Sequence, residues 1–161
     1  MRKEKIYLAG PLFGLADRAH NLRLQDLLVK LGYEVILPQA EAATISDIRL
    51  YLQAVKNNCL EQAGSSELIL VANLDGPDAD SGTSSEVGVR QGLKLPWIGY
   101  RTDFRTDQNL EVGFNAMLQQ FDYPERIIIK PCFAKTKQEL DQFYVALAID
   151  IDGAIKSLKA S

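Results

Sequence analysis

Short apolar runs alternate along this chain with longer segments of helical period, and this alternation constrains the fold more than any other feature. The runs with strand character are residues 6–9, 34–37, 68–72, 97–100 and 126–129. Strands that alternate with helical segments are typical of βαβ units, in which crossover helices join parallel strands. A chain of 161 residues with 47% hydrophobic content has the size and apolar content of one ordinary domain.

The intervening segments carry apolar residues at helical spacing. Three such stripes are Leu24, Leu27, Leu28 and Leu31, ending at Gly32; Ile48, Leu52, Val55 and Cys59; and, from about residue 136, Leu140, Phe143, Tyr144, Leu147 and Ile151. We therefore predict an α/β fold, a flavodoxin-like doubly wound sandwich with a five-stranded parallel sheet, in a single domain over residues 1–161. In such sheets, ligands bind beyond the carboxyl ends of the strands, near the point where strand order reverses.

The charge pattern narrows the class of partner. Formal net charge is -3, and the 18 basic residues are scattered, so we expect neither a nucleic-acid polymer nor a membrane as partner. The longest apolar stretches have only strand length and no signal peptide is visible, which predicts a cytoplasmic protein. Cys59, Cys132 and His20 do not supply four ligands for a structural zinc ion, so no metal site is expected.

The segment 73–88, NLDGPDADSGTSSEVG, gathers four carboxylates after an apolar run. Residues 82–85 are predicted to turn into the next helix, with Glu86 in its first turn, where the helix dipole favours the ionised form unless burial outweighs it. A fixed, ionised carboxylate suits attack on a carbon that becomes cationic, as in glycosyl transfer. The alternatives are a hydrophilic loop with a Ser/Thr cap, which composition alone favours, and a phosphate cradle, which the neighbouring carboxylates disfavour.

Four segments together resemble the nucleoside 2-deoxyribosyltransferases. In chain order they are Ile6-Tyr7-Leu8-Ala9-Gly10-Pro11-Leu12-Phe13, Asn73-Leu74-Asp75-Gly76, Asp80-Ser81-Gly82-Thr83-Ser84-Ser85-Glu86-Val87-Gly88 and Asn115-Ala116-Met117. The resemblance implies a flavodoxin-like fold and exchange of the base of a 2'-deoxynucleoside, through a covalent deoxyribosyl intermediate on a glutamate. It also implies that no cofactor is required, and that 2'-deoxynucleosides and free nucleobases are the partners.

The same resemblance assigns catalytic roles. By its resemblance to the family motif, Glu86 matches the position of the nucleophile. Tyr7 matches the residue whose hydroxyl holds that carboxylate in place, and Asp80 matches the residue that orients the sugar. Taken alone, Tyr7 is equally compatible with a core tyrosine.

Further positions match substrate-binding residues of the family. Phe13 would form an apolar wall, although packing is the simpler interpretation of that residue alone, and Gly10 and Gly82 would allow close approach of the substrate or serve turns. Asn115 and Met117 correspond to residues that a neighbouring subunit lends to the sugar's 5'-hydroxyl end, which implies a homo-oligomer. In isolation they would be an exposed asparagine and a core methionine.

One position departs from the family. Many members carry an aspartate near the end of the second long helix that handles the base, and here the local match places Cys59, most simply a buried core residue. Asp75 is our candidate to replace that acid, and Asp78 is a weaker one, because a leaving base needs protonation or hydrogen bonding. Gln39, after the second strand, is a candidate for recognising a base edge.

The predicted function is therefore transfer of a 2-deoxyribosyl group between nucleobases, in nucleotide salvage. The nearest alternative is an N-glycosidase for 2'-deoxynucleoside 5'-monophosphates, for which Ser81, residues 83–85, and Arg101 or Arg105 are the candidate phosphate ligands. A non-catalytic nucleotide-sensing module is a third possibility. Purine or pyrimidine preference stays open.

Overall fold

The computed structural model describes residues 3–38, 47–105 and 114–160, and it contains a five-stranded, all-parallel sheet of order β2-β1-β3-β4-β5. The strands are β1 (Lys5–Ala9), β2 (Glu34–Ile36), β3 (Leu68–Asn73), β4 (Trp97–Arg101) and β5 (Ile127–Ile129). Each predicted strand is present, and its bounds are shifted by no more than about one residue. The order is that of the flavodoxin-like fold, and it reverses at β1, between β2 and β3.

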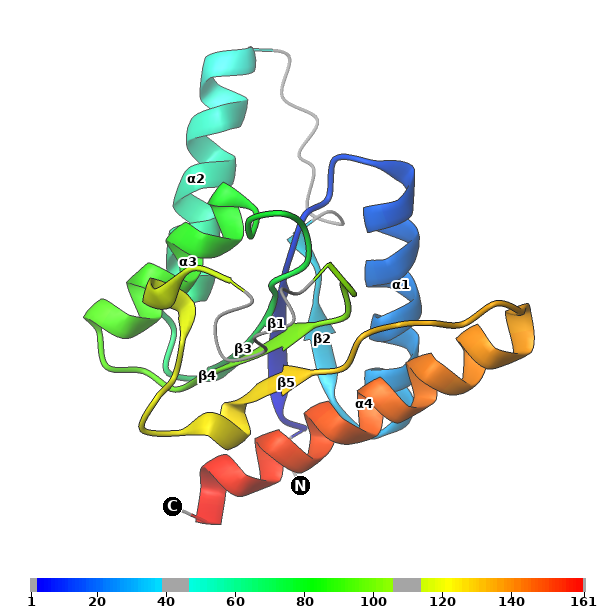
Figure 1. The fold of residues 1–161 in the computed structure, drawn as a ribbon. Helices are drawn as coiled ribbons and strands as arrows, with labels where there is room; N and C mark the ends of the chain where they lie inside the picture. Colours follow the sequence, from blue (N-terminus) through cyan, green and yellow to red (C-terminus); the bar gives the residue numbers. More distant parts are fainter. Residues whose placement is uncertain (1–2, 39–46, 106–113, 161) are drawn as a thin grey trace.

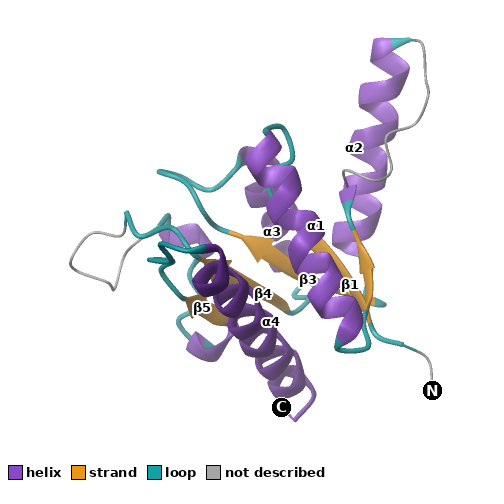
Figure 2. Cartoon of the chain, turned by 90° about the vertical axis from the view of Figure 1, so that its right-hand side faces the viewer, coloured by secondary structure: helices purple, strands orange, loops and turns teal. Residues whose placement is uncertain are grey.

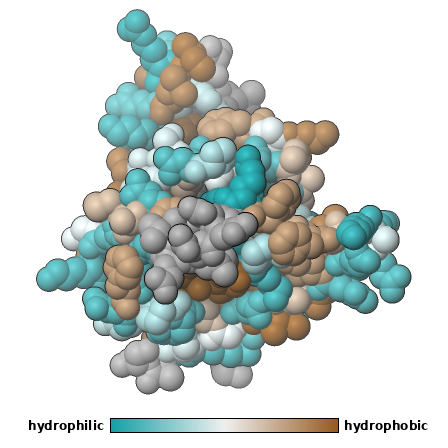
Figure 3. Space-filling view, viewed as in Figure 1, coloured by the Kyte–Doolittle hydropathy of each residue, from teal (hydrophilic) through white to brown (hydrophobic). Residues whose placement is uncertain are grey.

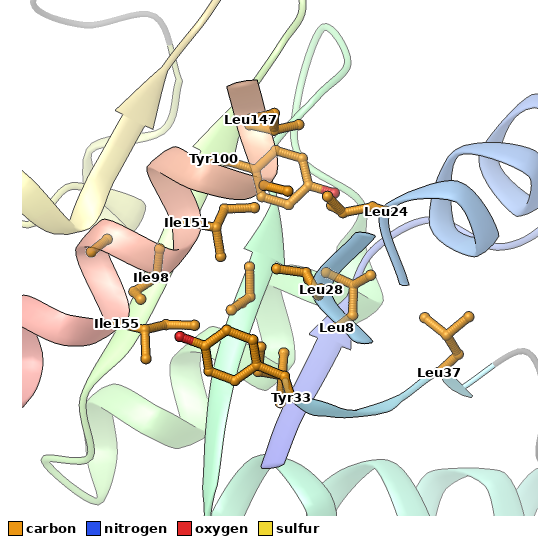
Figure 4. Close-up of a cluster of buried hydrophobic side chains, with 14 residues drawn as sticks. Leu8, Leu24, Leu28, Tyr33, Leu37, Ile98, Tyr100, Leu147, Ile151 and Ile155 are labelled. Carbon is orange, nitrogen blue, oxygen red and sulfur yellow. The ribbon is translucent and has the colours of Figure 1, made fainter. Parts of the chain in front are cut away.

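Helices cover both faces of this sheet (Figure 1; Figure 2). They are α1 (Leu15–Lys30), α2 (Ile48–Gly64), α3 (Ser81–Gly92) and α4 (Lys137–Ala160). One buried cluster joins Leu24 and Leu28 of α1 to Leu147 and Ile151 of α4, across sheet residues such as Ile98 (Figure 4). A second cluster on the other face joins the sheet to α2 and α3.

Strand alternation decides which side chains of β1 reach each cluster. Ile6 and Leu8 belong to the cluster under α1 and α4, whereas Tyr7 and Ala9 belong to the cluster under α2 and α3. The polar hydroxyl of Tyr7 is thereby directed to the same side of the sheet as α3.

The amino-terminal half of α2 projects beyond the rest of the chain (Figure 1; Figure 2). The predicted stripe is helical, but its members Ile48, Leu52 and Val55 are 65%, 57% and 38% exposed. Only Ala63 of α2 is buried. Figure 3 shows hydrophobic residues at the surface of this projecting end. Among the described residues, therefore, none buries this apolar face of α2.

The predicted start of α3 is wrong by several residues. Residues 82–85 lie inside the helix, whose N-cap is Asp80, and Glu86 is therefore in the second turn. The cause is the Asp80 carboxylate, which accepts a 3.0 Å hydrogen bond from the amide of Thr83 and so closes the first turn early.

None of the helices in the described part of the chain has the length and apolarity needed to cross a bilayer.

Candidate active site

Tyr7 and Glu86 meet in the buried layer between the sheet and α3. The Tyr7 hydroxyl donates a 2.6 Å hydrogen bond to Oε1 of Glu86. Tyr7 is 1% exposed and Glu86 is 8% exposed. A buried carboxylate is stable only when it is hydrogen-bonded, so this contact fixes both the position and the orientation of Glu86.

Opposing influences set the protonation of Glu86. Burial raises the pKa of its carboxyl above the ordinary value near 4.5, hydrogen bonds from Tyr7 and Cys59 lower the pKa, and the negative charge of Asp80 raises it. Burial prevails, so the net effect is upward, against the expectation from the helix dipole. The pKa of Tyr7 is raised far above 10 by burial and by the Glu86 charge, so Tyr7 remains a proton-bearing donor.

Cys59 is part of this cluster rather than of the core. It is half-buried on α2, and its side chain is near enough to Glu86 and Tyr7 to affect the pKa of both. The expectation of a buried core cysteine is therefore wrong. The last turns of α2 pack against α3, and this contact carries the Cys59 thiol to the carboxylate instead of into the apolar cluster.

Asp80 joins the cluster to the loop that precedes α3. Its Oδ2 accepts hydrogen bonds from the amide and the hydroxyl of Thr83, at 3.0 and 3.2 Å. A side chain at Gly82 would place its Cβ 3.0 Å from the same oxygen, so glycine leaves room for the capping carboxylate. Gly10 serves a similar close approach at the end of β1, because a Cβ there would lie 3.1 Å from the Cβ of Asn73.

A cleft of about 700 Å³ opens at the carboxyl ends of β1, β3 and β4, at the edge where strand order reverses. Its lining is rich in carboxylates, namely Asp17, Asp75, Asp78, Asp80 and Asp103. Because Asp80 lines this cleft and acts electrostatically on Glu86, the cleft adjoins the Tyr7 and Glu86 pair. The flavodoxin-like sheet thus places an acidic hollow where such folds bind their ligands.

Asp75 lines the cleft, but its oxygens are engaged. They accept hydrogen bonds from the amide of Thr102 at 2.5 Å, from its hydroxyl at 2.6 Å, and from the amide of Asp103 at 2.8 Å. These contacts tie the loop after β3 to the loop after β4. Asp78, by contrast, is exposed, and its Oδ1 accepts a 3.1 Å hydrogen bond from the next amide.

The two arginines proposed as phosphate ligands both have internal roles. Arg101 is 1% exposed, and its guanidinium donates to the carbonyls of Leu74 and Gly76 at 2.5 and 2.8 Å. Arg105 forms an ion pair with Asp103 and holds the pKa of that carboxyl well below its ordinary value. Backbone carbonyls of the acidic loop therefore hold the buried Arg101 guanidinium, and neither arginine is left as a ready phosphate ligand.

The single histidine of the chain, considered from the sequence only as a metal ligand, also lines the cleft. Nδ1 of His20 lies 2.9 Å from the hydroxyl of Tyr144, and Nε2 lies 2.9 Å from the hydroxyl of Tyr100. Burial lowers the pKa of His20, which favours the neutral ring. The sequence carried no signal for this arrangement beyond the presence of one histidine among aromatic helix residues.

The family model for nucleoside 2-deoxyribosyltransferase matches residues 6–126 of the chain. The chain belongs to this family. No curated protein matches it at the level of sequence.

Solved structures agree with this family. A conserved protein from Enterococcus faecalis V583 is 26% identical, with a TM-score of 0.62 over 94% of this chain and 99% of that one. A 2-deoxyribosyltransferase from Bacillus psychrosaccharolyticus is 20% identical, with a TM-score of 0.51 over 80% of this chain and 99% of that one. A 2-desoxiribosyltransferase from Leishmania mexicana is 19% identical, with a TM-score of 0.59 over 88% and 97%. At these identities, the two transferases establish the shared fold.

The remaining positions that the family resemblance singled out lie at the surface. Phe13 is 82% exposed in the loop before α1, and Met117 is 74% exposed rather than in the core. Asn115 is also exposed, and its Oδ1 accepts a 3.0 Å hydrogen bond from the amide of Met117, which shapes the short 3-10 turn Ala116–Leu118. Gln39 lies outside the described residues.

Proposed function

We propose that this family member is an enzyme that transfers the 2-deoxyribosyl group between nucleobases, with Glu86 as the covalent nucleophile. The observation that carries the proposal is the buried 2.6 Å contact from Tyr7 to Glu86, made from β1, the strand at which strand order reverses. A binding module has no need of a desolvated carboxylate held in one orientation. A nucleophile has that need, because orientation and desolvation raise its reactivity.

The proposed reaction consists of two displacements at C1'. In the first, an oxygen of ionised Glu86 forms a bond to C1' as the bond from C1' to the base nitrogen breaks, and the electron pair leaves with the base. In the second, a nitrogen of another base attacks C1' and the Glu86 ester bond breaks, which returns the carboxylate. Two inversions retain the configuration of the sugar. The absent 2'-hydroxyl makes the cationic transition state easier to reach, which supports a 2'-deoxy preference.

The departing base takes up a proton or a hydrogen bond, and the acidic cleft is the proposed source. Asp78 is exposed beside the cleft, whereas Asp75 is engaged by three donors from Thr102 and Asp103. We therefore assign Asp75 mainly to the positioning of this loop. Of the two, Asp78 is the proposed donor of a proton or hydrogen bond to the departing base, by way of a water molecule. Asp80 remains the residue proposed to orient the sugar.

Phe13, Gly10, Gly82 and Gln39 remain proposed substrate neighbours. The exposed ring of Phe13 suits an apolar wall that becomes covered when a base binds.

The charges of the cleft favour nucleosides over nucleoside monophosphates as substrates. Its carboxylates outnumber its cations, Arg101 is buried against backbone carbonyls, and Arg105 is paired with Asp103. A 5'-phosphate would meet repulsion there rather than a fixed cation. This supports base exchange over the hydrolysis of monophosphates.

We also propose that the active enzyme is a homo-oligomer with shared sites, acting in nucleotide salvage in the cytoplasm, and that residues 1–161 form one domain. Asn115, Met117 and the apolar face of α2 are exposed in the single chain. Cys59, at the end of that face, contacts Glu86, so a partner that covers α2 would also exclude water from the nucleophile.

The test of this function is a base-exchange assay with deoxyinosine as donor, with and without adenine. Formation of deoxyadenosine only when adenine is present, without added phosphate, is the expected result. Hypoxanthine and free deoxyribose with no new nucleoside would indicate a hydrolase. Absence of turnover with both this donor and thymidine would leave a ligand-binding module as the function.

A further inference from the structure

A second cleft, of about 630 Å³, lies at the opposite end of the sheet from Glu86. Its lining includes the segments that enter β4 and β5, so it sits at the amino ends of the strands. The residues that carry the argument are Gln91, Lys94, Gln120, Phe121, Tyr123 and Arg126. This cleft differs in charge from the catalytic one, because two cations line it.

Lys94 has a backbone conformation that is unfavourable for residues other than glycine. Its φ is 55°, in the left-handed region, immediately after the C-cap Leu93 of α3. The amides of Lys94 and Leu95 donate to the carbonyls of Gln91 and Arg90, at 3.0 and 2.9 Å, and these bonds close the helix end. Glycine is the residue that favours this position. A lysine there destabilises the fold slightly, and what it adds is a cationic side chain on the cleft wall.

Arg126 supplies the second cation. Its guanidinium carbon lies 3.7 Å from the centroid of the Tyr123 ring, so the aromatic face fixes the charge in place. Nε of Arg126 is buried and has no hydrogen-bond partner in the described structure. Because that atom is closed to solvent, a ligand in the cleft meets the remainder of the guanidinium, which belongs to a half-buried side chain.

The surroundings leave both cations available. Asp122 is the carboxylate on the cleft wall, and none of the ion pairs between described residues joins it to Lys94 or Arg126. The walls are already fixed, because Gln91 donates to the carbonyl of Met117 at 2.7 Å and Gln120 donates to that of Trp97 at 3.0 Å. In addition, the Phe121 ring is 77% exposed at this cleft.

We propose that this cleft binds the phosphate group of a small phosphorylated ligand. Lys94 and Arg126 contact the phosphate oxygens, and Phe121 offers a surface for a planar ring attached to that phosphate. Two cations on prearranged walls are the donors that phosphate oxygens require. The site is separate from the catalytic cleft and does not depend on the proposed function.

The experiment is calorimetric titration of the full chain with inorganic phosphate and with adenosine monophosphate, at low and high salt. The deciding variant is Lys94→Gly, because we expect it to keep or raise the melting temperature while it lowers the affinity for phosphate. Glycine relieves the left-handed strain, so the melting temperature stays the same or rises, while the affinity for the phosphorylated probe falls roughly tenfold or more. Arg126→Gln weakens binding to a similar degree. Lys137→Ala, which removes an exposed lysine of α4, is the matched control and leaves the affinity unchanged.

The two probes distinguish the source of the phosphate. Tighter binding of adenosine monophosphate than of phosphate, lost in Phe121→Ala, identifies a nucleotide, whereas equal binding identifies a smaller phosphate ester. Unchanged affinity in Lys94→Gly would place the probe elsewhere on the protein and overturn the proposal. Absence of binding of both probes at millimolar concentration would overturn it as well.

Discussion

The hydroxyl of Tyr7, on the face of β1 that α2 and α3 cover, donates a hydrogen bond to the carboxylate of Glu86 on α3. The two residues are 79 positions apart in the sequence. The pair links β1, the strand at which strand order reverses, to the helix that follows the acidic loop. If Glu86 is the nucleophile, as proposed, we expect Tyr7 to affect catalysis through the charge and orientation of Glu86.

In Tyr7→Phe, the acidic limb of the pH–rate profile moves to higher pH. The reaction requires ionised Glu86, whose pKa is already raised by burial, and loss of the Tyr7 hydrogen bond removes an influence that lowers it. Loss of one hydrogen bond to a charged group also slows the reaction by about tenfold to a hundredfold. The measurement is kcat/KM against pH for both proteins. An acidic limb at the same pH in both would show that Tyr7 does not act through Glu86.

Glu86→Gln makes the fold more stable, and the gain depends on pH. The folded-state pKa of Glu86 lies above its ordinary value near 4.5. The folded protein therefore holds this proton more tightly than the unfolded chain does, and the native protein loses stability as pH rises through that window. Glutamine does not titrate, so the difference in melting temperature grows from about pH 4.5 upward. Thermal unfolding of both proteins at several pH values checks this, and a difference that shrinks with rising pH contradicts it.

Asp75→Asn destabilises the protein more than it slows the chemical step. The carboxylate accepts hydrogen bonds from Thr102 and from the amide of Asp103, and an amide group replaces one acceptor oxygen with a donor. We expect a loss of about 2–4 kcal/mol in the free energy of unfolding. Denaturant unfolding gives that value. Asp78→Asn is the matched control because Asp78 is exposed, and it should leave stability nearly unchanged. If Asp75→Asn keeps full stability but loses turnover, Asp75 is a proton donor instead.

Mixing two inactive variants restores activity if sites are shared between subunits. Glu86→Gln lacks the nucleophile, and the double variant Asn115→Ala with Met117→Ala lacks the exposed residues proposed to reach a neighbour's site. A mixed oligomer contains one site with both parts intact. Base exchange that appears only after the two are unfolded and refolded together is the expected result. If mixed oligomers form and the mixture is still inactive, each site takes Glu86 and the Asn115 and Met117 residues from the same chain.

The strands were predictable because a parallel sheet is buried on both faces, so β1 and β3 appear in the sequence as apolar runs. The start of α3 was not predictable from its Ser/Thr residues, since the side chain of Asp80 closes the first turn earlier. The hydrogen bond from Thr102 to Asp75 forms because the loops after β3 and β4 lie in contact. The sequence around either residue gives no sign of this contact.

The pair of Tyr7 and Glu86 illustrates the same difference. The motif resemblance implied that the Tyr7 hydroxyl holds the Glu86 carboxylate, and the structure shows how strand alternation directs Tyr7 toward α3 to make that contact. Cys59 was placed correctly on its helix face, but that face proved to be largely exposed, with the thiol at Glu86.

The most direct test of the central claim is mass spectrometry of the protein after incubation with deoxyinosine in the absence of an acceptor base. The account predicts an adduct of one deoxyribosyl group on the peptide that contains Glu86, removed on addition of adenine and absent in Glu86→Gln. Base exchange that proceeds at full rate in Glu86→Gln, or an adduct mapped to another residue, would contradict it.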